Sequence, residues 1–271
     1  MNRKFHFTKA TRKRLMDFLR GKIAPAEASA PRVPLRSAAQ THVGKVRATN
    51  QDALVVSEAL QLYGVADGMG GHKGGETAST GCRDAVLAAL EERKAGTAAL
   101  KEAIQVANAA LFRQQQEDER LSGMGTTLSV IWLDEASVHI AHVGDSRVYC
   151  LRDGELLQMT DDHSLVGELM RQGVLTAEQA EKHPMRNVIT RAVGTEEDIC
   201  VDLATEPRRA GDIWMVCSDG LYGMVKEADM TDILRENAPE KAAELLVEAA
   251  LNGGGRDNIS VVVLHDEEGA Q

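Results

Sequence analysis

Short apolar runs of four to seven residues recur along the chain and limit what it can fold into. They predict strands at Leu54–Ser57, Leu62–Ala66, Thr127–Leu133, Val138–Val143, Val148–Leu151, Ile199–Leu203, Ile213–Cys217 and Ile259–Leu264. Helical spacing occurs at Glu76–Lys94, Thr97–Glu119, Glu227–Asn237 and Pro239–Asn252. Because strands cluster and helices come in pairs between the clusters, the order favours antiparallel sheets covered by helices over a parallel sheet. We predict one mixed domain of helices and strands.

The net charge of −10 is divided unevenly along the chain. Residues 1–41 hold ten Lys and Arg against Asp17 and Glu27, a balance of +8, so the remaining residues carry −18. A surface this acidic repels nucleic-acid phosphates, which argues against a nucleic-acid partner. No apolar run approaches the roughly 20 residues needed to cross a bilayer, so we expect no transmembrane segment.

The first 41 residues differ from the rest. The basic part has Leu15, Phe18 and Leu19 on one helical face, and an Ala/Pro-rich stretch follows it. This extension is either a helix on a linker that docks a partner or a membrane surface, or a solvated tail. We expect a folded domain over residues 42–265 and a short tail over 266–271. Four separated cysteines and the lack of a secretory signal indicate a reducing, cytoplasmic setting.

Five aspartates stand where predicted strands end or begin. They are Asp52, Asp67, Asp145, Asp219 and Asp257. A single Asp-Gly pair is ordinary turn chemistry. Five such residues can converge if these strand ends share one edge of the fold.

Converging carboxylates would repel one another. At roughly 5 Å and an effective dielectric of about 20, each ionised pair costs about 3 kcal/mol, against a typical fold stability of about 5–15 kcal/mol. Bound cations would remove that cost. Because all-oxygen ligands select hard ions, the sequence predicts Mg²⁺ or Mn²⁺ rather than Zn²⁺.

Eight short motifs occur in a fixed order. They are Arg47–Asp52, Val65–His72, Gly125–Thr127, Val143–Arg147, Asp162–Ser164, Arg191–Gly194, Cys217–Leu221 and Asp257–Ile259. In this order the chain resembles the metal-dependent protein phosphatases of type 2C, especially their bacterial branch, over roughly residues 42–264. The resemblance implies an α+β fold: a four-layer αββα sandwich of two antiparallel sheets flanked by helices, here the catalytic domain of residues 42–265.

The resemblance also implies a hydrolase for phosphoserine and phosphothreonine that opposes a bacterial Ser/Thr kinase. Its partners would be phosphorylated proteins, including that kinase and its substrates. Two catalytic Mg²⁺ or Mn²⁺ ions would activate a bridging hydroxide for in-line attack on phosphorus, and a third ion would bind nearby.

Site residues are implied position by position. Asp67 resembles the catalytic bridging ligand of both metals, and Gly68 would offer its backbone carbonyl to the second. Asp219 and Asp257 match the other ligands of the first metal, and Asp145 with Asp219 matches a third-metal site. Asp52 would act through a metal-bound water. Arg47 resembles the catalytic arginine that binds the substrate phosphate, for which its bidentate fork is suited.

The chain departs from eukaryotic relatives at two positions. Met69 stands where they have a histidine that is a candidate acid for the leaving group, so we expect a metal-bound water to donate that proton. His72 is either a substitute acid or an ordinary loop histidine. Gln51 replaces a glutamate, which favours water in the shell of the second metal.

The stretch Leu165–Pro184 aligns with a mobile flap that selects substrates in this family, although a surface helical hairpin fits its sequence equally well. Ser164 is predicted to cap a helix that runs through Met170, and Thr176–Gln179 forms a capping-box pattern. Asp162, His163 and Ser164 are sequence neighbours, so they cannot form a Ser-His-Asp triad.

Two other functions are open to the same fold. One is a catalytically silent module that binds phosphoproteins, which the presence of all four ligand aspartates disfavours. The other is a phosphatase dedicated to anti-sigma-factor antagonists, whose members usually carry a sensor domain.

Overall fold

Two antiparallel sheets form the centre of the protein in the computed structural model, which describes residues 35–267. The first sheet has the strand order β1-β11-β10-β7-β8, and the second has β2-β3-β5-β6-β9 with the short β4 paired to β3. The first sheet contains β1 (Leu35–His42), β7 (Arg147–Arg152), β8 (Glu155–Gln158), β10 (Ile213–Cys217) and β11 (Ile259–Asp266). The second contains β2 (Asp52–Ser57), β3 (Leu62–Met69), β4 (Gly125–Thr126), β5 (Leu128–Leu133), β6 (Ser137–Val143) and β9 (Asp202–Pro207).

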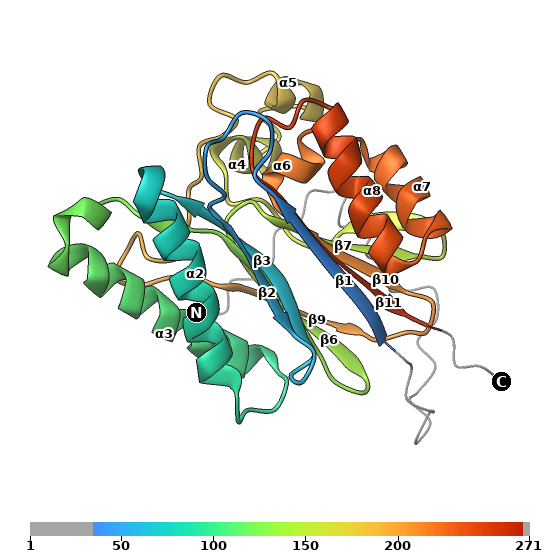
Figure 1. Ribbon diagram of the computed structural model, residues 1–271, viewed down its shortest axis with the longest axis horizontal. Helices are drawn as coiled ribbons and strands as arrows, with labels where there is room; N and C mark the ends of the chain where they lie inside the picture. Colours follow the sequence, from blue (N-terminus) through green and yellow to red (C-terminus); the bar gives the residue numbers. More distant parts are fainter. Residues whose placement is uncertain (1–34, 268–271) are drawn as a thin grey trace.

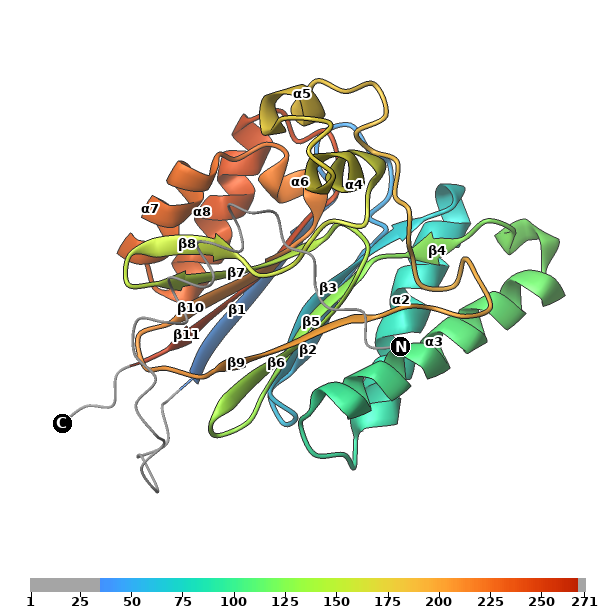
Figure 2. The same ribbon diagram turned by 180° about the vertical axis from the view of Figure 1, so that it is seen from behind.

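Helices cover the outer face of each sheet, so the predicted four-layer sandwich is confirmed (Figure 1). The second sheet is covered by α2 (Gly71–Leu90) and α3 (Thr97–Glu117). The short η1 (Glu119–Leu121) contacts both of these helices. The first is covered by α6 (Asp219–Tyr222), α7 (Glu227–Glu236) and α8 (Pro239–Asn252). Two further short helices, α4 (Leu165–Arg171) and α5 (Ala177–Glu181), stand at one end of the sandwich (Figure 2).

Three hydrophobic clusters fill the three interfaces between the layers. Strand β10 shows how one strand serves two of them: Met215 and Cys217 face α7 and α8, while Trp214 and Val216 face the opposite sheet. Successive side chains point to opposite faces of a strand, so a strand covered on both faces is apolar throughout. This explains the unbroken apolar runs in the sequence.

The folded part begins earlier than predicted. Residues 35–41 were expected to be linker, but Leu35–His42 is the edge strand β1, paired along its length with β11. Its small and polar residues give little hydrophobic signal, because only a few of them, such as Ala38 and Ala39, pack on the core. At the other end, Asp266 belongs to β11 and is buried, rather than starting a tail. The rest of the predicted extension, residues 1–34, and residues 268–271 lie outside the described residues.

Other element boundaries also shift. Helix α2 begins at Gly71 rather than at the predicted Glu76. The prediction missed the first turn because that turn is rich in glycine and has no apolar periodicity. Strand β9 lies over Asp202–Pro207 rather than Ile199–Leu203, since its register is set by pairing with β6. The four-residue β8 was not predicted. Between Leu35 and Glu267, no helix has the length and apolar composition needed to cross a membrane.

Candidate metal centre and substrate cavity

The predicted aspartates converge at one end of the sandwich, and both sheets contribute to the cluster. Asp52 on β2 lies directly opposite Asp67 on β3. Asp145 occupies the turn that crosses from β6 in one sheet to β7 in the other, and Asp219 begins α6 directly after β10. Asp257 precedes β11. All except Asp52 line a cavity of about 320 Å³, together with Arg47 and Gly68.

A close backbone approach brings two of these aspartates together. A Cβ atom placed on Gly220 would lie 2.0 Å from the carbonyl oxygen of Asn258, so only glycine fits there. The start of α6 therefore packs directly on the segment that carries Asp257. This contact explains physically why Asp219 is followed by glycine.

Crowding perturbs the ionisation of the cluster. Burial raises the pKa of Asp67 well above its usual range, and the charges of the other four aspartates raise it further. Burial raises the pKa of Asp145 to about 8 and that of Asp219 to about 7, with a neighbouring aspartate adding to each shift. Burial also raises the pKa of Asp52 to about 6. At neutral pH, part of the cluster holds protons unless a cation replaces them.

Asp52 does not line the cavity, and its carboxylate is held by the residue that precedes Asp219. Its Oδ2 accepts a hydrogen bond of 2.8 Å from the Ser218 hydroxyl, whose oxygen accepts one of 3.0 Å from the Ser260 amide. Among the described residues, Asp52 Oδ1 and Asp219 Oδ1 are buried acceptor oxygens without a hydrogen-bond partner. Such atoms are costly unless something pairs with them. An all-oxygen donor set with orphaned, desolvated acceptors fits a hard divalent cation.

Arg47 lies at the mouth of the cavity. Its Nη2 is 2.7 Å from Asp257 Oδ2, and its side chain is 52% exposed. This ion pair turns Asp257 toward the arginine. Among the side chains that the structure describes, no three of His, Cys, Asp or Glu surround a common point as ligands of one ion would.

The neighbouring positions also line the cavity. Gly68 follows Asp67 in β3, and its amide donates to the Gln51 carbonyl at 3.1 Å. Met69, which follows Gly68, is part of the cavity wall. His72 has its backbone in the first turn of α2, but its side chain lies outside the described part of the structure.

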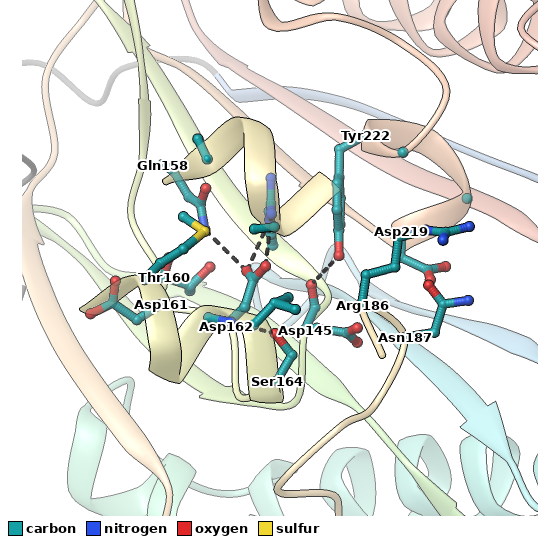
Figure 3. A pocket seen from close by; sticks show the side chains of 18 of the residues that line it. Asp145, Gln158, Thr160, Asp161, Asp162, Ser164, Arg186, Asn187, Asp219 and Tyr222 are labelled. Atoms are coloured by element: carbon teal, nitrogen blue, oxygen red, sulfur yellow. Dashed lines mark hydrogen bonds and ion pairs between the residues drawn. The ribbon is translucent and has the colours of Figure 1, made fainter. Parts of the chain in front are cut away.

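A second cavity, of about 1010 Å³, adjoins the first and shares Arg47, Asp145 and Asp219 with it. Figure 3 shows Gln158 and Asp162 toward one end of this cavity and Asn187 and Asp219 toward the other. Helices α4 and α5 form part of its wall, so the predicted flap segment lies beside the aspartates. Ser164 caps α4, and Thr176 with Gln179 forms the capping box of α5, as predicted.

Asp162, His163 and Ser164 point to different partners. Asp162 binds Arg147 through two hydrogen bonds, of 2.9 Å to Nε and 2.7 Å to Nη2. His163 is buried with Nε2 at 3.1 Å from Asp202. The exclusion of a triad is therefore confirmed.

Some residues of the site were not predicted. Asn187 and Tyr222 line the cavities, but neither carries a sequence signal of its own. Tyr222 directly follows the Cys217–Leu221 motif. If a helix had been predicted to start at Asp219, Tyr222 would have been expected one helical turn from Asp219, beside the cluster. Asn187 comes from the segment after α5, and only the folded chain brings it near Asp219.

Comparison with known proteins gives a consistent result. The family model described as protein phosphatase 2C matches residues 39–251. The serine/threonine protein phosphatase PstP of Mycobacterium tuberculosis is 41% identical over 232 residues, covering 84% of this chain and 44% of PstP. This chain therefore spans less than half the length of that relative. The serine/threonine phosphatase stp of Listeria welshimeri is 37% identical over 235 residues, covering 83% of this chain and 93% of stp.

Solved structures agree. The crystal structure of Mycobacterium tuberculosis PstP superposes with a TM-score of 0.81 at 40% identity, covering 86% of this chain and 99% of that one. The PstP catalytic domain in complex with two manganese ions gives 0.79 at 37% identity, over 85% and 97%. These matches agree with the ordered motifs and with the four-layer sandwich. Together they show that the chain belongs to the protein phosphatase 2C family.

Proposed function

We propose that this chain is a Mg²⁺- or Mn²⁺-dependent protein phosphatase that hydrolyses phosphoserine and phosphothreonine. The observation that supports this most strongly is the cavity lined by four aspartates, with Asp52 adjoining Asp67. Burial and mutual repulsion raise the pKa values of Asp67, Asp145 and Asp219, so a bound cation would stabilise the ionised form of these carboxyls. The relative crystallised with two manganese ions supports the choice of metal.

The proposed ligand roles follow the implied assignment. Asp67, Asp219 and Asp257 would hold one ion, Asp67 and the Gly68 carbonyl a second, and Asp145 with Asp219 a third. Ions bound there would neutralise the carboxylates and activate water for attack on phosphorus. Asp52 would act through a metal-bound water; it lies opposite Asp67 and accepts a hydrogen bond from the Ser218 hydroxyl.

Arg47 would bind the phosphate. Its guanidinium lies at the mouth of the cavity and is half exposed, so a phosphate can reach it from solvent. When a phosphate binds, its oxygens would replace the Asp257 carboxylate as the partner of Arg47. Asp257 would then be free to turn toward the other aspartates. Met69 has no acidic proton, so the proton for the leaving alkoxide has to come from another group or from water.

The substrate is proposed to be a polypeptide, with the larger cavity as its path to the metal centre. Beside this cavity, the segment from α4 to β9 exposes Val174, Met185 and Val188, which offers apolar surface to a protein chain. Arg186 adds a cation to the cavity wall. A Ser/Thr kinase and its phosphorylated targets are the proposed partners.

The test is turnover of p-nitrophenyl phosphate and of a phosphothreonine peptide by the full chain, with Mn²⁺ and after chelation. We expect Mn²⁺-dependent phosphate release from both. Asp67→Asn should lower it by at least about 10³-fold, because the shared ligand is lost. Asp84→Asn is the matched control, since Asp84 is 66% exposed on α2.

Two results would contradict the proposal. Absence of Mn²⁺-dependent release by the wild type would instead favour a silent phosphoprotein-binding module. Unchanged turnover by Asp67→Asn would show that the aspartate cluster is not the catalytic centre.

A further inference from the structure

Tyr222 makes a direct contact with the turn that carries Asp145. Its hydroxyl donates a hydrogen bond of 3.0 Å to the backbone carbonyl oxygen of Asp145. Tyr222 is the last residue of α6, and Asp219 is the first. A single helical turn therefore carries one aspartate of the cluster and a hydrogen bond to the backbone of another, as Figure 3 shows.

The ring of Tyr222 is held in place from its face. The guanidinium carbon of Arg147 lies 3.7 Å from the ring centroid, a cation–π contact. Arg147 is itself fixed by its two hydrogen bonds to Asp162 and by a bond of 2.9 Å from Nη1 to the hydroxyl of Tyr149. Movement of the ring would break this stack, so the hydroxyl of Tyr222 is directed at one place.

The other flank of Asp145 is anchored in the core. The Gly144 amide donates to Nδ1 of buried His163 at 3.0 Å, and the His163 amide donates to the Gly144 carbonyl at 2.7 Å. The Ser146 hydroxyl is 2.7 Å from the hydroxyl of Thr127. These contacts fix the turn to Thr127, which lies between β4 and β5, and to His163, which lies just before the flap segment. The hydrogen bond from the Tyr222 hydroxyl connects the turn to α6 as well, and so it fixes the position of Asp145 relative to Asp219.

We propose that Tyr222 is a positioning residue for metal binding: it holds the Asp145 turn against α6 so that Asp145 and Asp219 can ligate one cation together. This inference rests on the proposed function, since it takes the aspartate cluster to be a divalent-metal centre. Tyr222 touches neither the phosphate nor the reacting atoms in this role. It acts through the backbone of Asp145.

Two Tyr→Phe substitutions separate this role from general stabilisation. Tyr222→Phe removes the hydrogen bond to Asp145 and keeps the ring on which Arg147 stacks. Tyr149→Phe is the matched control: it also removes one tyrosine hydroxyl, but that hydroxyl pairs with Arg147 Nη1, whereas the Tyr222 hydroxyl pairs with the Asp145 carbonyl.

The experiment is a Mn²⁺ titration of the full-length wild type and both variants by calorimetry, with thermal unfolding in chelator as a check on folding. We expect Tyr222→Phe to weaken the lowest-affinity Mn²⁺ site by about three- to tenfold, the loss of one hydrogen bond, and to spare the tighter sites. Tyr149→Phe should bind Mn²⁺ as the wild type does, because its Arg147 keeps both hydrogen bonds to Asp162 and stays stacked on Tyr222. Turnover of Tyr222→Phe should recover at saturating Mn²⁺.

Wild-type affinity at every Mn²⁺ site of Tyr222→Phe would overturn the inference, and so would an equal loss in Tyr149→Phe. Both outcomes leave the proposed function intact. By contrast, a wild type that binds no Mn²⁺ would refute the proposed function itself.

Discussion

Asp145 shows how the surroundings of one residue set its protonation. It is buried, and burial with the charge of Asp219 raises its pKa to about 8. The fold thus places a carboxyl where it is neutral at pH 7 unless a cation pairs with it. The same holds to a lesser degree for Asp219, whose pKa is raised to about 7. These two residues make the stability of the protein depend on pH and on metal in a linked way.

In chelator, the contribution of Asp145 and Asp219 to the free energy of unfolding should fall as the pH rises from about 4 to about 8. The folded protein keeps protons on Asp145 and Asp219 that the unfolded chain has already released, so the folded state binds more protons throughout this window. Stability contributed by these raised pKa values is complete below the unfolded pKa and is lost as the pH passes the folded pKa. Urea unfolding at pH 5, 7 and 9 measures this.

Asp145→Asn is the diagnostic variant for this pH effect. It should be more stable than the wild type at pH 8 in chelator, on the order of 1 to 3 kcal/mol, and show a smaller pH dependence. Mn²⁺ should stabilise the wild type more at pH 8 than at pH 6, because fewer protons compete. An Asp145→Asn variant whose stability in chelator depends on pH as strongly as that of the wild type would disprove this account.

The turn between β6 and β7 shows how an element positions the site. It carries the chain from one sheet to the other, and Gly144 adopts φ +107° there. A Cβ at this position would lie 2.6 Å from Cβ and Cγ2 of Thr127. The glycine is therefore required both by its backbone angle and by the closeness of Thr127, which directly precedes β5. The constrained position of Gly144 in turn fixes where the next residue, Asp145, lies.

Gly144→Ala should destabilise the protein by about 2 to 4 kcal/mol, the left-handed backbone cost plus overpacking against Thr127. Gly154→Ala is the matched control: it has φ +82° with nothing within 4 Å of the new Cβ, and should cost only about 1 to 2 kcal/mol. Urea unfolding of both variants measures the difference. Equal losses would show that contact with Thr127 does not constrain the turn.

At the scale of the whole molecule, the site exists only when the two sheets are packed together. Asp52 and Asp67 belong to one sheet, Asp219 and Asp257 to the end of the other, and Asp145 to the turn between them. The middle cluster, with Trp214 and Tyr63 among its buried residues, holds the sheets together. Strand β1 closes the edge of the first sheet by pairing with β11.

Removal of β1 tests the importance of that edge. A chain beginning at Gly44 should lose on the order of 2 to 4 kcal/mol of stability and aggregate more readily, because the edge of β11 and its apolar neighbours become exposed. A chain beginning at Leu35 keeps β1 and is the control; we expect it to unfold at the urea midpoint of the full chain. The same midpoint for both shortened chains would contradict this role of β1.

Sequence reasoning identified most strands and the main helices, because strands buried on both faces and amphipathic helices produce strong local patterns. It also selected the aspartates of the cluster, since acidic residues at strand ends are visible without knowledge of the fold. It missed β1 and misplaced β9, whose polar residues gain order only from pairing with β11 and β6. Those pairings join segments far apart in the chain, and local composition does not encode them.

The sequence by itself determined the family, the layered architecture and the identity of the five acidic residues, because motif order and hydrophobic periodicity are written along the chain. Only the tertiary structure decided how those residues meet. It paired Arg47 with Asp257 and placed Tyr222 against Asp145. Their distances and raised pKa values arise from burial and from charges on other elements, and both exist only once the two sheets and their helices have packed.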